Sequence, residues 1–411
     1  MKYALIGEKL SHSFSKILHE RLGLSYDLKE LNKEEVGTFV LNNDYDGFNV
    51  TIPYKKEVIP YLDEISPLSS LVGSVNTVVK RGGKNFGFNT DVRGLEYQIE
   101  SRGVTLTDKN VLILGSGGAS LTAVALCKSK NVKSYKVVSR SGEVNYENCY
   151  DFINTEIIIN TTPVGMYPNQ EGLPIEIDRF PSLVAVFDLI YNPIRTNLVL
   201  EAERRGIITS GGLKMLCMQG IKSEELWLDK KIEEEVAETL IKSIAVEKNN
   251  LVLSGMAGCG KSTVGKATAE RLNLPFFDVD EEITKISKKT PSQIINEEGE
   301  ERFREIETEV VKELSKTGGK VISLGGGSIL REENQRALKR NGIVIYLSRD
   351  IEKLALDNRP LSQKYGIREL FEKRKETYFK SADVIVSNDG EISKTIEEVI
   401  KEYENSCYKR S

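Results

Sequence analysis

Gly-Met-Ala-Gly-Cys-Gly-Lys-Ser-Thr, residues 255–263, fits the Gly-x4-Gly-Lys-Ser/Thr pattern of a phosphate-binding loop. An apolar run, Leu251-Val252-Leu253, precedes it, and the pattern of residues 264–272 predicts a helix after it. Glycines let backbone amide groups point at phosphate oxygens, and the start of a helix adds a positive dipole end. This strand–loop–helix setting predicts a nucleotide site rather than a simple glycine turn at a helix start.

Each side chain of this loop has an expected task in binding ATP. Lys261 would reach the β- and γ-phosphates, and the Ser262 hydroxyl would sit on Mg²⁺. Cys259 lies inside the loop, where packing is its default role and oxidation could hinder ATP. The residues expected to bind ATP are Gly255, Gly258, Cys259, Gly260, Lys261, Ser262 and Thr263.

Length and composition limit what the rest of the chain can be. At 411 residues the chain is expected to form two or three domains. A net charge of −4 argues against nucleic acid as a partner, and no apolar run is long enough to span a membrane. Five scattered cysteines without a Cys-x-x-Cys pair favour reduced thiols in a cytoplasmic protein, with neither a disulfide frame nor a zinc site.

Residues 1–100 alternate predicted strands and helices, and polar side chains gather where strands end. Strands are expected at residues 3–6 and 46–52, with a helix from Ser15 to about Leu22. Hydroxyls, amides, one lysine and one carboxylate form a set suited to a small polyhydroxylated acid. Taken singly, each Ser or Asn is more often a turn or cap residue, so the inference depends on their joint occurrence.

Four motifs in this region together resemble shikimate dehydrogenase. They are Gly7-x3-Ser-His-Ser-x-Ser15, Asn49-Val-Thr-Ile-Pro-x-Lys55, Gly73-Ser-Val-Asn-Thr77 and Gly87-x-Asn-Thr-Asp91. The resemblance implies that Lys55 and Asp91 are the catalytic pair. Ketone reduction needs a proton donor at the developing oxyanion, and a lysine beside a carboxylate can supply it. The residues implied to hold the substrate are Ser13, Ser15, Thr51, Asn76, Tyr191 and Gln219.

Residues 101–219 carry a variant of the dinucleotide-binding fingerprint. A predicted strand at 108–114 leads into Gly-Ser-Gly-Gly-Ala-Ser, residues 115–120, with a helix expected from about Leu121. The next predicted strand ends in Ser139-Arg140-Ser141, and an arginine there suits the 2′-phosphate of NADP. The resemblance places Gly212 and Met215 by the nicotinamide, although Met215 could equally be a core residue. The residues expected to bind NADP(H) are Gly115, Gly117, Gly118, Ala119, Ser139, Arg140, Gly212 and Met215.

Residues 248–411 add three further motifs to the phosphate-binding loop. They are Asp278-Val-Asp280, expected where a strand over residues 275–280 ends, Phe303-Arg-x-x-Glu307 and Gly325-Gly-Gly327. The strand at 320–324 carries no Asp, so Asp278 is the best candidate to hold the metal with Ser262. Together with the loop these motifs resemble shikimate kinase.

The second resemblance assigns further roles. Asp280 would orient the attacking hydroxyl, and Arg359 in a lid would close over the phosphates. A planar guanidinium is well shaped to grip the substrate carboxylate, as expected of Arg304 and Arg374. The residues implied to bind shikimate are Asp280, Arg304, Gly326, Gly327 and Arg374.

The sequence thus predicts an α/β protein: a two-lobed dehydrogenase with a Rossmann-like NADP domain, followed by a P-loop kinase domain with a parallel sheet. The expected divisions are 1–100 for the substrate lobe, with 220–247 packing back on it, 101–219 for the NADP lobe, and 248–411 for the kinase. The expected activities are NADPH-dependent reduction of 3-dehydroshikimate and ATP-dependent phosphorylation of shikimate, and a homodimer is compatible with both. Two alternatives stay open: a quinate-type dehydrogenase joined to another small-acid kinase, and a ligand-sensing regulator with one inactive half.

Overall fold

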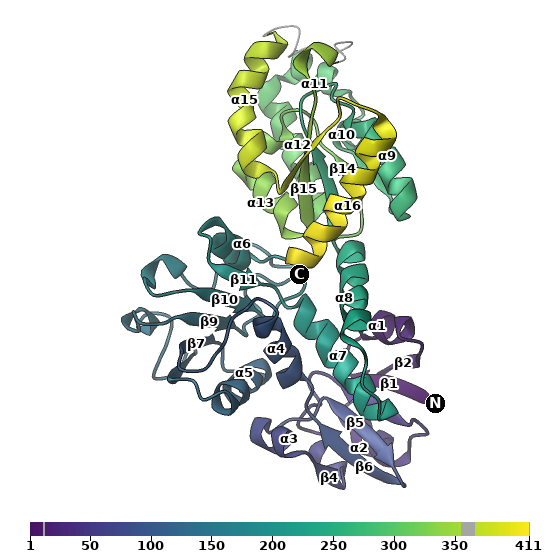
Figure 1. The fold of residues 1–411 in the computed structure, drawn as a ribbon, viewed down its shortest axis with the longest axis vertical. Coiled ribbons are helices and arrows are strands. Elements are labelled where there is room, and N and C mark those ends of the chain that lie inside the picture. Colours follow the sequence, from purple (N-terminus) through teal and green to yellow (C-terminus); the bar gives the residue numbers. More distant parts are fainter. Residues whose placement is uncertain (11–12, 355–365, 411) are drawn as a thin grey trace. The chain divides into compact units, whose positions relative to one another are not determined.

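A computed structural model describes residues 1–10, 13–354 and 366–410 of the chain. These residues form two compact units, each built on strands covered by helices (Figure 1). The first unit comprises Met1–Gly165, Glu171–Tyr191 and Glu201–Ile241, and the second comprises Met166–Gln170, Asn192–Leu200 and Lys242–Ser411. No helix in the described ranges combines the length and the apolar character that crossing a bilayer would take.

The first unit contains a six-stranded mixed sheet in the order β2-β1-β3-β5-β6-β4. Strand β3 runs parallel to β1, whereas β5 runs antiparallel to both β3 and β6. The strands are β1 Lys2–Gly7, β2 Ser25–Glu30, β3 Gly47–Val50, β4 Glu64–Ile65, β5 Thr77–Arg81 and β6 Lys84–Phe88, and the helices are α1 Ser15–Arg21, α2 Glu35–Asn42, α3 Pro67–Val72 and α4 Asp91–Glu100.

A second sheet of the same unit is fully parallel, in the order β11-β10-β9-β7-β8. Near-continuous apolar strands such as Ile157–Asn160 are typical of a parallel sheet buried on both faces. Its strands are β7 Asn110–Leu114, β8 Ser134–Val138, β9 Ile157–Asn160, β10 Ala185–Asp188 and β11 Ile208–Ser210, and the helices are α5 Gly118–Ser129, α6 Asn197–Arg204, which begins in the second unit, and α7 Leu213–Leu228.

Helix α7 returns the chain from the second sheet to the first. It lies against α4, α1 and β5. The Trp227 ring stacks on Tyr3 at a centroid distance of 4.6 Å, and its Nε1–H donates to the carbonyl oxygen of Val78 at 2.9 Å. A side chain at Gly47 would meet the indole at 2.4 Å, so glycine allows the close approach. The division of residues 1–247 into a substrate lobe and a cofactor lobe stays a prediction.

The second unit is built on a five-stranded parallel sheet in the order β13-β14-β12-β15-β16. This order places β12, which leads into the phosphate-binding loop, at the centre. The strands are β12 Asn250–Ser254, β13 Phe276–Asp278, β14 Val321–Ser323, β15 Gly342–Ser348 and β16 Val384–Ser387; the helices are α8 Glu234–Lys248, which begins in the first unit, α9 Lys261–Leu272, α10 Val279–Ser287, α11 Pro291–Glu298, α12 Glu300–Ser315, α13 Glu332–Arg340, α15 Ile367–Ser381 and α16 Ile392–Arg410.

The Asn192–Leu200 segment of the second unit is buried and charged at its centre. The Arg195 side chain is fully buried, with Nη1 3.6 Å from a carboxylate oxygen of Asp383. The Arg195 N–H donates to the carbonyl oxygen of Arg340 at 2.9 Å, and Arg410 lies on the same Asp383 oxygen at 3.0 Å. Burial opposes ionisation of Asp383, but Arg195 and Arg410 hold its pKa below the ordinary value.

Candidate active sites

The first candidate site lies at one edge of the six-stranded sheet. Strands β1 and β3 are parallel neighbours, so the segments that follow them leave the sheet at the same edge. Because β5 is antiparallel to β3 and β6, the start of β5 and the end of β6 lie at that edge too. This topology brings together the segments that carry Ser13, Thr51, Lys55, Asn76 and Asp91.

Two side chains far apart in sequence form an ion pair at this edge. The Lys55 Nζ lies 2.6 Å from Oδ2 of Asp91, and both side chains are partly buried. Asp91 is the first residue of α4, where the helix dipole favours a negative charge. The Asn76 Nδ2 donates to Oδ1 of Asp91 at 2.9 Å and lies 3.3 Å from Oε1 of Gln219 on α7. An ammonium, a carboxylate and two amides thus converge on one point.

The other residues predicted to hold the substrate lie on the loops around this edge. Ser13 Oγ accepts the N–H of Ser15 at 3.2 Å, and the N–H of Thr51 donates to the carbonyl oxygen of Ile6 at 2.9 Å. Tyr191 follows β10 and contacts the ring of Phe14 edge to face at 5.1 Å. Burial raises the pKa of the Tyr191 phenol, so it stays a hydrogen-bond donor at neutral pH.

The second sheet presents an open helix start. Helix α5 begins at Gly118, earlier than the expected Leu121, directly after the Gly115–Gly117 turn. Gly115 has φ 103°, and a Cβ there would lie 2.9 Å from Thr161 Oγ1, so the turn requires glycine. A Cβ at Gly117 or Gly118 would meet no atom within 4 Å. The first amide groups of α5, including that of Ala119, are therefore accessible to an anion.

Ser139 and Arg140 follow β8, the parallel neighbour of β7, so they leave the sheet at the same edge as this turn. Arg140 is exposed and available to a phosphate. Gly212 caps the start of α7, with Met215 in the first turn of that helix. A Cβ at Gly212 would lie 2.2 Å from the carbonyl oxygen of Leu189, so only glycine fits this approach.

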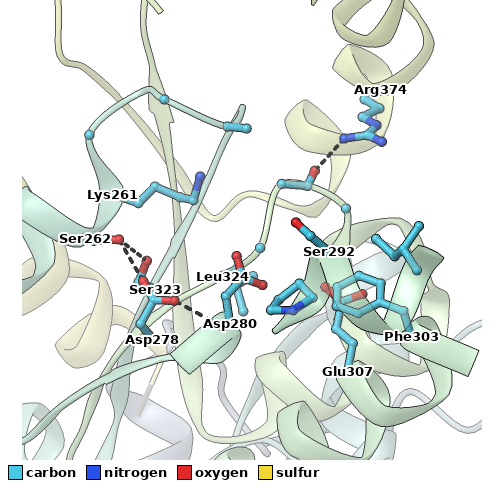
Figure 2. Close-up of a pocket in the computed structure, with 18 of the residues that line it drawn as sticks. Lys261, Ser262, Asp278, Asp280, Ser292, Phe303, Glu307, Ser323, Leu324 and Arg374 are labelled. Carbon is cyan, nitrogen blue, oxygen red and sulfur yellow. Dashed lines mark hydrogen bonds between the residues drawn. The ribbon is translucent and has the colours of Figure 1, made fainter. Parts of the chain in front are cut away.

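The second candidate site is a cavity of about 660 Å³ in the second unit (Figure 2). It lies at the carboxyl ends of β12, β13 and β14, where ligands bind in open parallel sheets. Most of the residues predicted to bind nucleotide or substrate line it. These are Gly258, Gly260, Lys261, Ser262, Thr263, Asp278, Asp280, Arg304, Gly326, Gly327 and Arg374.

The phosphate-binding loop has the backbone that its glycines predict. Gly255, Gly258 and Gly260 have φ values of 147°, 88° and 99°, which favour glycine. Helix α9 begins at Lys261, whose Nζ donates to the carbonyl oxygens of Gly255 and Met256 at 2.9 Å each. Cys259 is buried beneath the loop, and Asn388 Nδ2 donates to its carbonyl oxygen at 2.8 Å.

Two carboxylates and two hydroxyls lie at one end of this cavity, labelled in Figure 2. Ser262 Oγ donates to Oδ2 of Asp278 at 2.7 Å and lies 3.4 Å from Ser323 Oγ. The strand was expected to end at Asp280, but β13 stops at Asp278. The Asp278 side chain caps α10 by accepting the N–H of Asp280 at 3.1 Å. The short Asp side chain favours this cap over a longer strand.

Asp280 is accessible from the cavity, but its surroundings disfavour its charge. Burial, followed by the negative charges of Asp278 and Glu307, raises the pKa of Asp280 to about 6. Lys261 and Arg304 act in the opposite direction. A carboxylate with such a pKa is a stronger base than an ordinary aspartate.

Arg304 is fixed in the cavity by residues that were not predicted as part of the site. Its Nη1 donates to Oε2 of Glu307 at 2.6 Å, and the Glu307 side chain is only 1% exposed. Ser328 Oγ donates to the other Glu307 oxygen at 2.5 Å. A Cβ at Gly327 would lie 2.4 Å from the Arg304 guanidinium, so glycine makes room for that group.

Arg374 also lines the cavity, and its Nη1 donates to the carbonyl oxygen of Gly326 at 3.2 Å (Figure 2). Arg359, predicted in the lid, lies outside the described residues. Arg349 lines the cavity and was missed; it directly follows the last residue of β15, the parallel neighbour of β12. The rule that polar residues at carboxyl ends of parallel strands gather at one edge could have found it.

Comparisons with known proteins match two separate parts of the chain. Residues 5–78 match the family model described as shikimate dehydrogenase substrate binding domain, and residues 257–404 match the model described as shikimate kinase. The shikimate dehydrogenase (NADP(+)) of Caldicellulosiruptor bescii is 36% identical over 258 residues, covering 56% of this chain and 89% of that protein.

Solved structures resemble the same part of the chain. A chorismate mutase/shikimate 5-dehydrogenase fusion protein from Clostridium acetobutylicum is 34% identical, with a TM-score of 0.56 over 59% of this chain and 96% of that one. A shikimate 5-dehydrogenase from Thermus thermophilus, solved with NADP(H) and shikimate, is 26% identical, with a TM-score of 0.52 over 59% of this chain and 98% of that one.

Proposed function

The chain belongs to the shikimate dehydrogenase family and also carries a shikimate kinase domain, and from this premise we propose that it catalyses two consecutive reactions. The first unit reduces 3-dehydroshikimate to shikimate with NADPH. The second unit transfers the γ-phosphoryl group of ATP to the 3-hydroxyl of shikimate. The observation that carries the proposal is the presence, in one chain, of the Lys55–Asp91 pair and of a phosphate-binding loop facing Asp280 and Arg304.

For the dehydrogenase, we assign proton transfer to Lys55. When bound, NADPH supplies a hydride to the substrate carbonyl carbon. The Lys55 ammonium would give its proton to the carbonyl oxygen, because it is partly buried and held by Asp91 at 2.6 Å. Asn76 holds that carboxylate and also contacts Gln219, and both amides add hydrogen-bonding groups for ring hydroxyls. The exposed start of α5 and the Arg140 guanidinium suit the pyrophosphate and the 2′-phosphate of NADP.

For the kinase, we assign recognition of the acid to arginines and activation of the hydroxyl to Asp280. Arg304 and Arg374 present guanidinium groups to the same cavity and would hold the shikimate carboxylate. Asp280, which feels the positive charges of Lys261 and Arg304, would orient the attacking hydroxyl and accept its proton. Lys261 would exchange its contacts with Gly255 and Met256 for phosphate oxygens.

The donor set near Ser262 fits a magnesium ion. Mg²⁺ prefers oxygen ligands, keeps several waters, and uses one or two protein groups beside the phosphates. The Ser262 hydroxyl and Asp278 carboxylate lie 2.7 Å apart at the end of the cavity, where the phosphates would lie. Among the described residues no cluster of three or more His, Cys, Asp or Glu could hold a metal by itself.

A coupled assay on the full chain tests the proposal. 3-Dehydroshikimate, NADPH and MgATP are supplied together, and the products are identified by mass. Lys55→Ala should abolish NADPH oxidation and leave phosphorylation of added shikimate intact, and Lys261→Ala should do the reverse. Lys56→Ala, an exposed neighbour of Lys55, serves as the matched control. If wild-type chain converts neither substrate, the proposal fails.

The same assay separates the alternatives. Higher activity on quinate than on shikimate would favour a quinate-type dehydrogenase, and turnover of gluconate would favour another acid kinase. Ligand binding without turnover by one unit would favour a sensor. The groups that the two reactions need are all present, which supports two working catalysts. Lys55 contacts Asp91 in the first unit, and Lys261 and Asp280 line one cavity in the second.

A further inference from the structure

A buried histidine and a buried glutamate face each other in the first unit, away from solvent. His19 on α1 is 0% exposed and Glu224 on α7 is 1% exposed. Nδ1 of His19 lies 2.6 Å from Oε1 of Glu224. Its other ring nitrogen, Nε2, lies 3.2 Å from Oδ1 of Asn49. Neither residue touches the substrate groups proposed above, so the pair needs a separate explanation.

The surroundings of Asn49 determine which way its amide points. One end of the amide lies 3.1 Å from the carbonyl oxygen of Asn76, which can only accept a hydrogen bond. The NH₂ group must therefore be at that end, where it also lies 3.0 Å from Ser223 Oγ. The amide oxygen then faces Tyr26 OH at 2.7 Å and His19 Nε2 at 3.2 Å.

This orientation fixes the protons on His19. Because the Asn49 oxygen only accepts, Nε2 must carry a hydrogen. The 2.6 Å contact between Nδ1 and Glu224 also needs one proton between its two atoms. In the common arrangement a neutral imidazole carries its hydrogen on Nδ1 and lies beside an ionised Glu224. Here that arrangement would set the lone pair of Nε2 against a lone pair of the Asn49 oxygen. It would also leave a net negative charge in a fully buried site.

The pair is connected to the catalytic groups by buried hydrogen bonds. Asn49 holds the backbone of Asn76, and the Asn76 side chain accepts the N–H of Thr90 at 2.8 Å and donates to Asp91 at 2.9 Å. Ser223 Oγ lies 2.8 Å from Thr77 Oγ1 and 3.2 Å from Thr90 Oγ1, which ties α7 to the same group. A single network thus extends from Glu224 to the Lys55–Asp91 pair.

We propose that the His19–Glu224 pair permanently holds one proton between its members and, through Asn49, positions Asn76 and Asp91 for the dehydrogenase reaction. The proton resides either on the imidazole or on the carboxyl, and in both forms the pair is neutral overall. His19, Glu224 and Asn49 are positioning residues in this account, which rests on the proposed dehydrogenase function. Burial raises the pKa of Glu224 and the hydrogen bond from His19 opposes that shift in part, in keeping with a shared proton.

The protonation state can be read directly in the wild-type full-length chain. The sequence contains two histidines, so ¹⁵N-histidine labelling gives two imidazole spectra, and the one missing from His19→Gln belongs to His19. We expect Nε2 of His19 to carry a hydrogen at neutral pH. An unprotonated Nε2 with the hydrogen on Nδ1 would overturn the proposal, whatever the activity of the chain.

A pair of variants tests the positioning role. A Gln side chain places an amide nitrogen near the position of Nε2, whereas Asn places one near Nδ1, so only His19→Gln keeps a donor toward Asn49. His19→Asn should lower dehydrogenase kcat on the order of tenfold with KM changed less than about threefold, because misplacing Asp91 harms the chemical step more than binding. His19→Gln should recover most of that loss.

Equal losses of kcat in the two variants, or losses that follow the unfolding temperature alone, would show that His19 only fills space and would refute positioning. If both variants fail to fold, the wild-type spectrum is assigned from a His12→Gln variant instead, and it still decides whether the pair holds the proton. Absence of 3-dehydroshikimate reduction by the wild-type chain would instead refute the proposed function, and the spectrum would remain interpretable.

Discussion

Replacing Gly327 with alanine would add one methyl group where the kinase cavity has no room for it. A Cβ at this position would lie 2.4 Å from Nη2 and 2.6 Å from Nη1 of Arg304. The backbone offers no other obstacle, since Gly327 has φ −113° and ψ −11°, values that alanine adopts readily. The effect of Gly327→Ala is therefore confined to the guanidinium group proposed to hold the substrate carboxylate.

The size of the effect follows from these contacts. An ordinary contact of about 3.4 Å requires the guanidinium to move by about 1 Å, and a displacement of that size can cost on the order of 100-fold in rate. Arg304 cannot move freely, because Glu307 holds Nη1 at 2.6 Å and is itself held by Ser328. Losing one charge-assisted hydrogen bond costs about 1.5–3 kcal/mol, or roughly 10- to 150-fold. We expect kcat/KM for shikimate to fall within that range.

The assay is ATP-dependent phosphorylation of added shikimate by the full chain, with NADPH-dependent reduction measured on the same preparation. Gly390→Ala is the matched control, since a Cβ there meets no atom within 4 Å. The reasoning is refuted if Gly327→Ala keeps kcat/KM for shikimate within about twofold of wild type, because a 1 Å shift of Arg304 would then be without consequence. An equal loss of dehydrogenase activity would refute it as well, by showing general unfolding.

Three further substitutions have expected outcomes. The pKa of Asp280 is raised to about 6 in the folded chain, so its charge opposes folding above that pH. Asp280→Asn should therefore raise the melting temperature at about pH 8 and not at about pH 4, and it should abolish phosphorylation. Wild-type kinase activity should fall as the pH drops through about 6. Arg140→Ser should lower kcat/KM for NADPH by roughly tenfold or more and leave NADH use unchanged, measured by initial rates. Arg195→Leu should destabilise the second unit by about 3 kcal/mol in urea titrations, less at acid pH where Asp383 can be protonated.

The sequence predicted much of both candidate sites because their residues follow strand ends. Lys55 and Asp91 are 36 positions apart. Their place after predicted strands indicated a shared polar site, whereas the resemblance to shikimate dehydrogenase was what paired the two residues. The phosphate-binding loop was predictable for a local reason: its glycines need positive φ, and its lysine begins a helix. The catalytic roles given to these residues remain predictions.

The parts that were missed depend on long-range packing rather than on local pattern. Glu307 sits in a helical motif, but its contact with Ser328 exists only because α12 lies against the turn after β14. The prediction that a strand runs to Asp280 was wrong, because Asp278 caps a helix that begins at Val279. The partner of His19 is 205 positions away, and no spacing in the sequence connects the two.

The second unit is built from three separate chain segments, and this affects any attempt to express the two units separately. The chain enters that unit first at Met166–Gln170, again at Asn192–Leu200, and finally at Lys242. A kinase fragment that starts at α8 would therefore lack Arg195. The buried Asp383 carboxylate would then lose one of the two arginines that lie beside it. Inhibitor screens and crystallisation trials on the kinase are better served by the whole chain with one catalyst disabled by a point substitution than by a single excision.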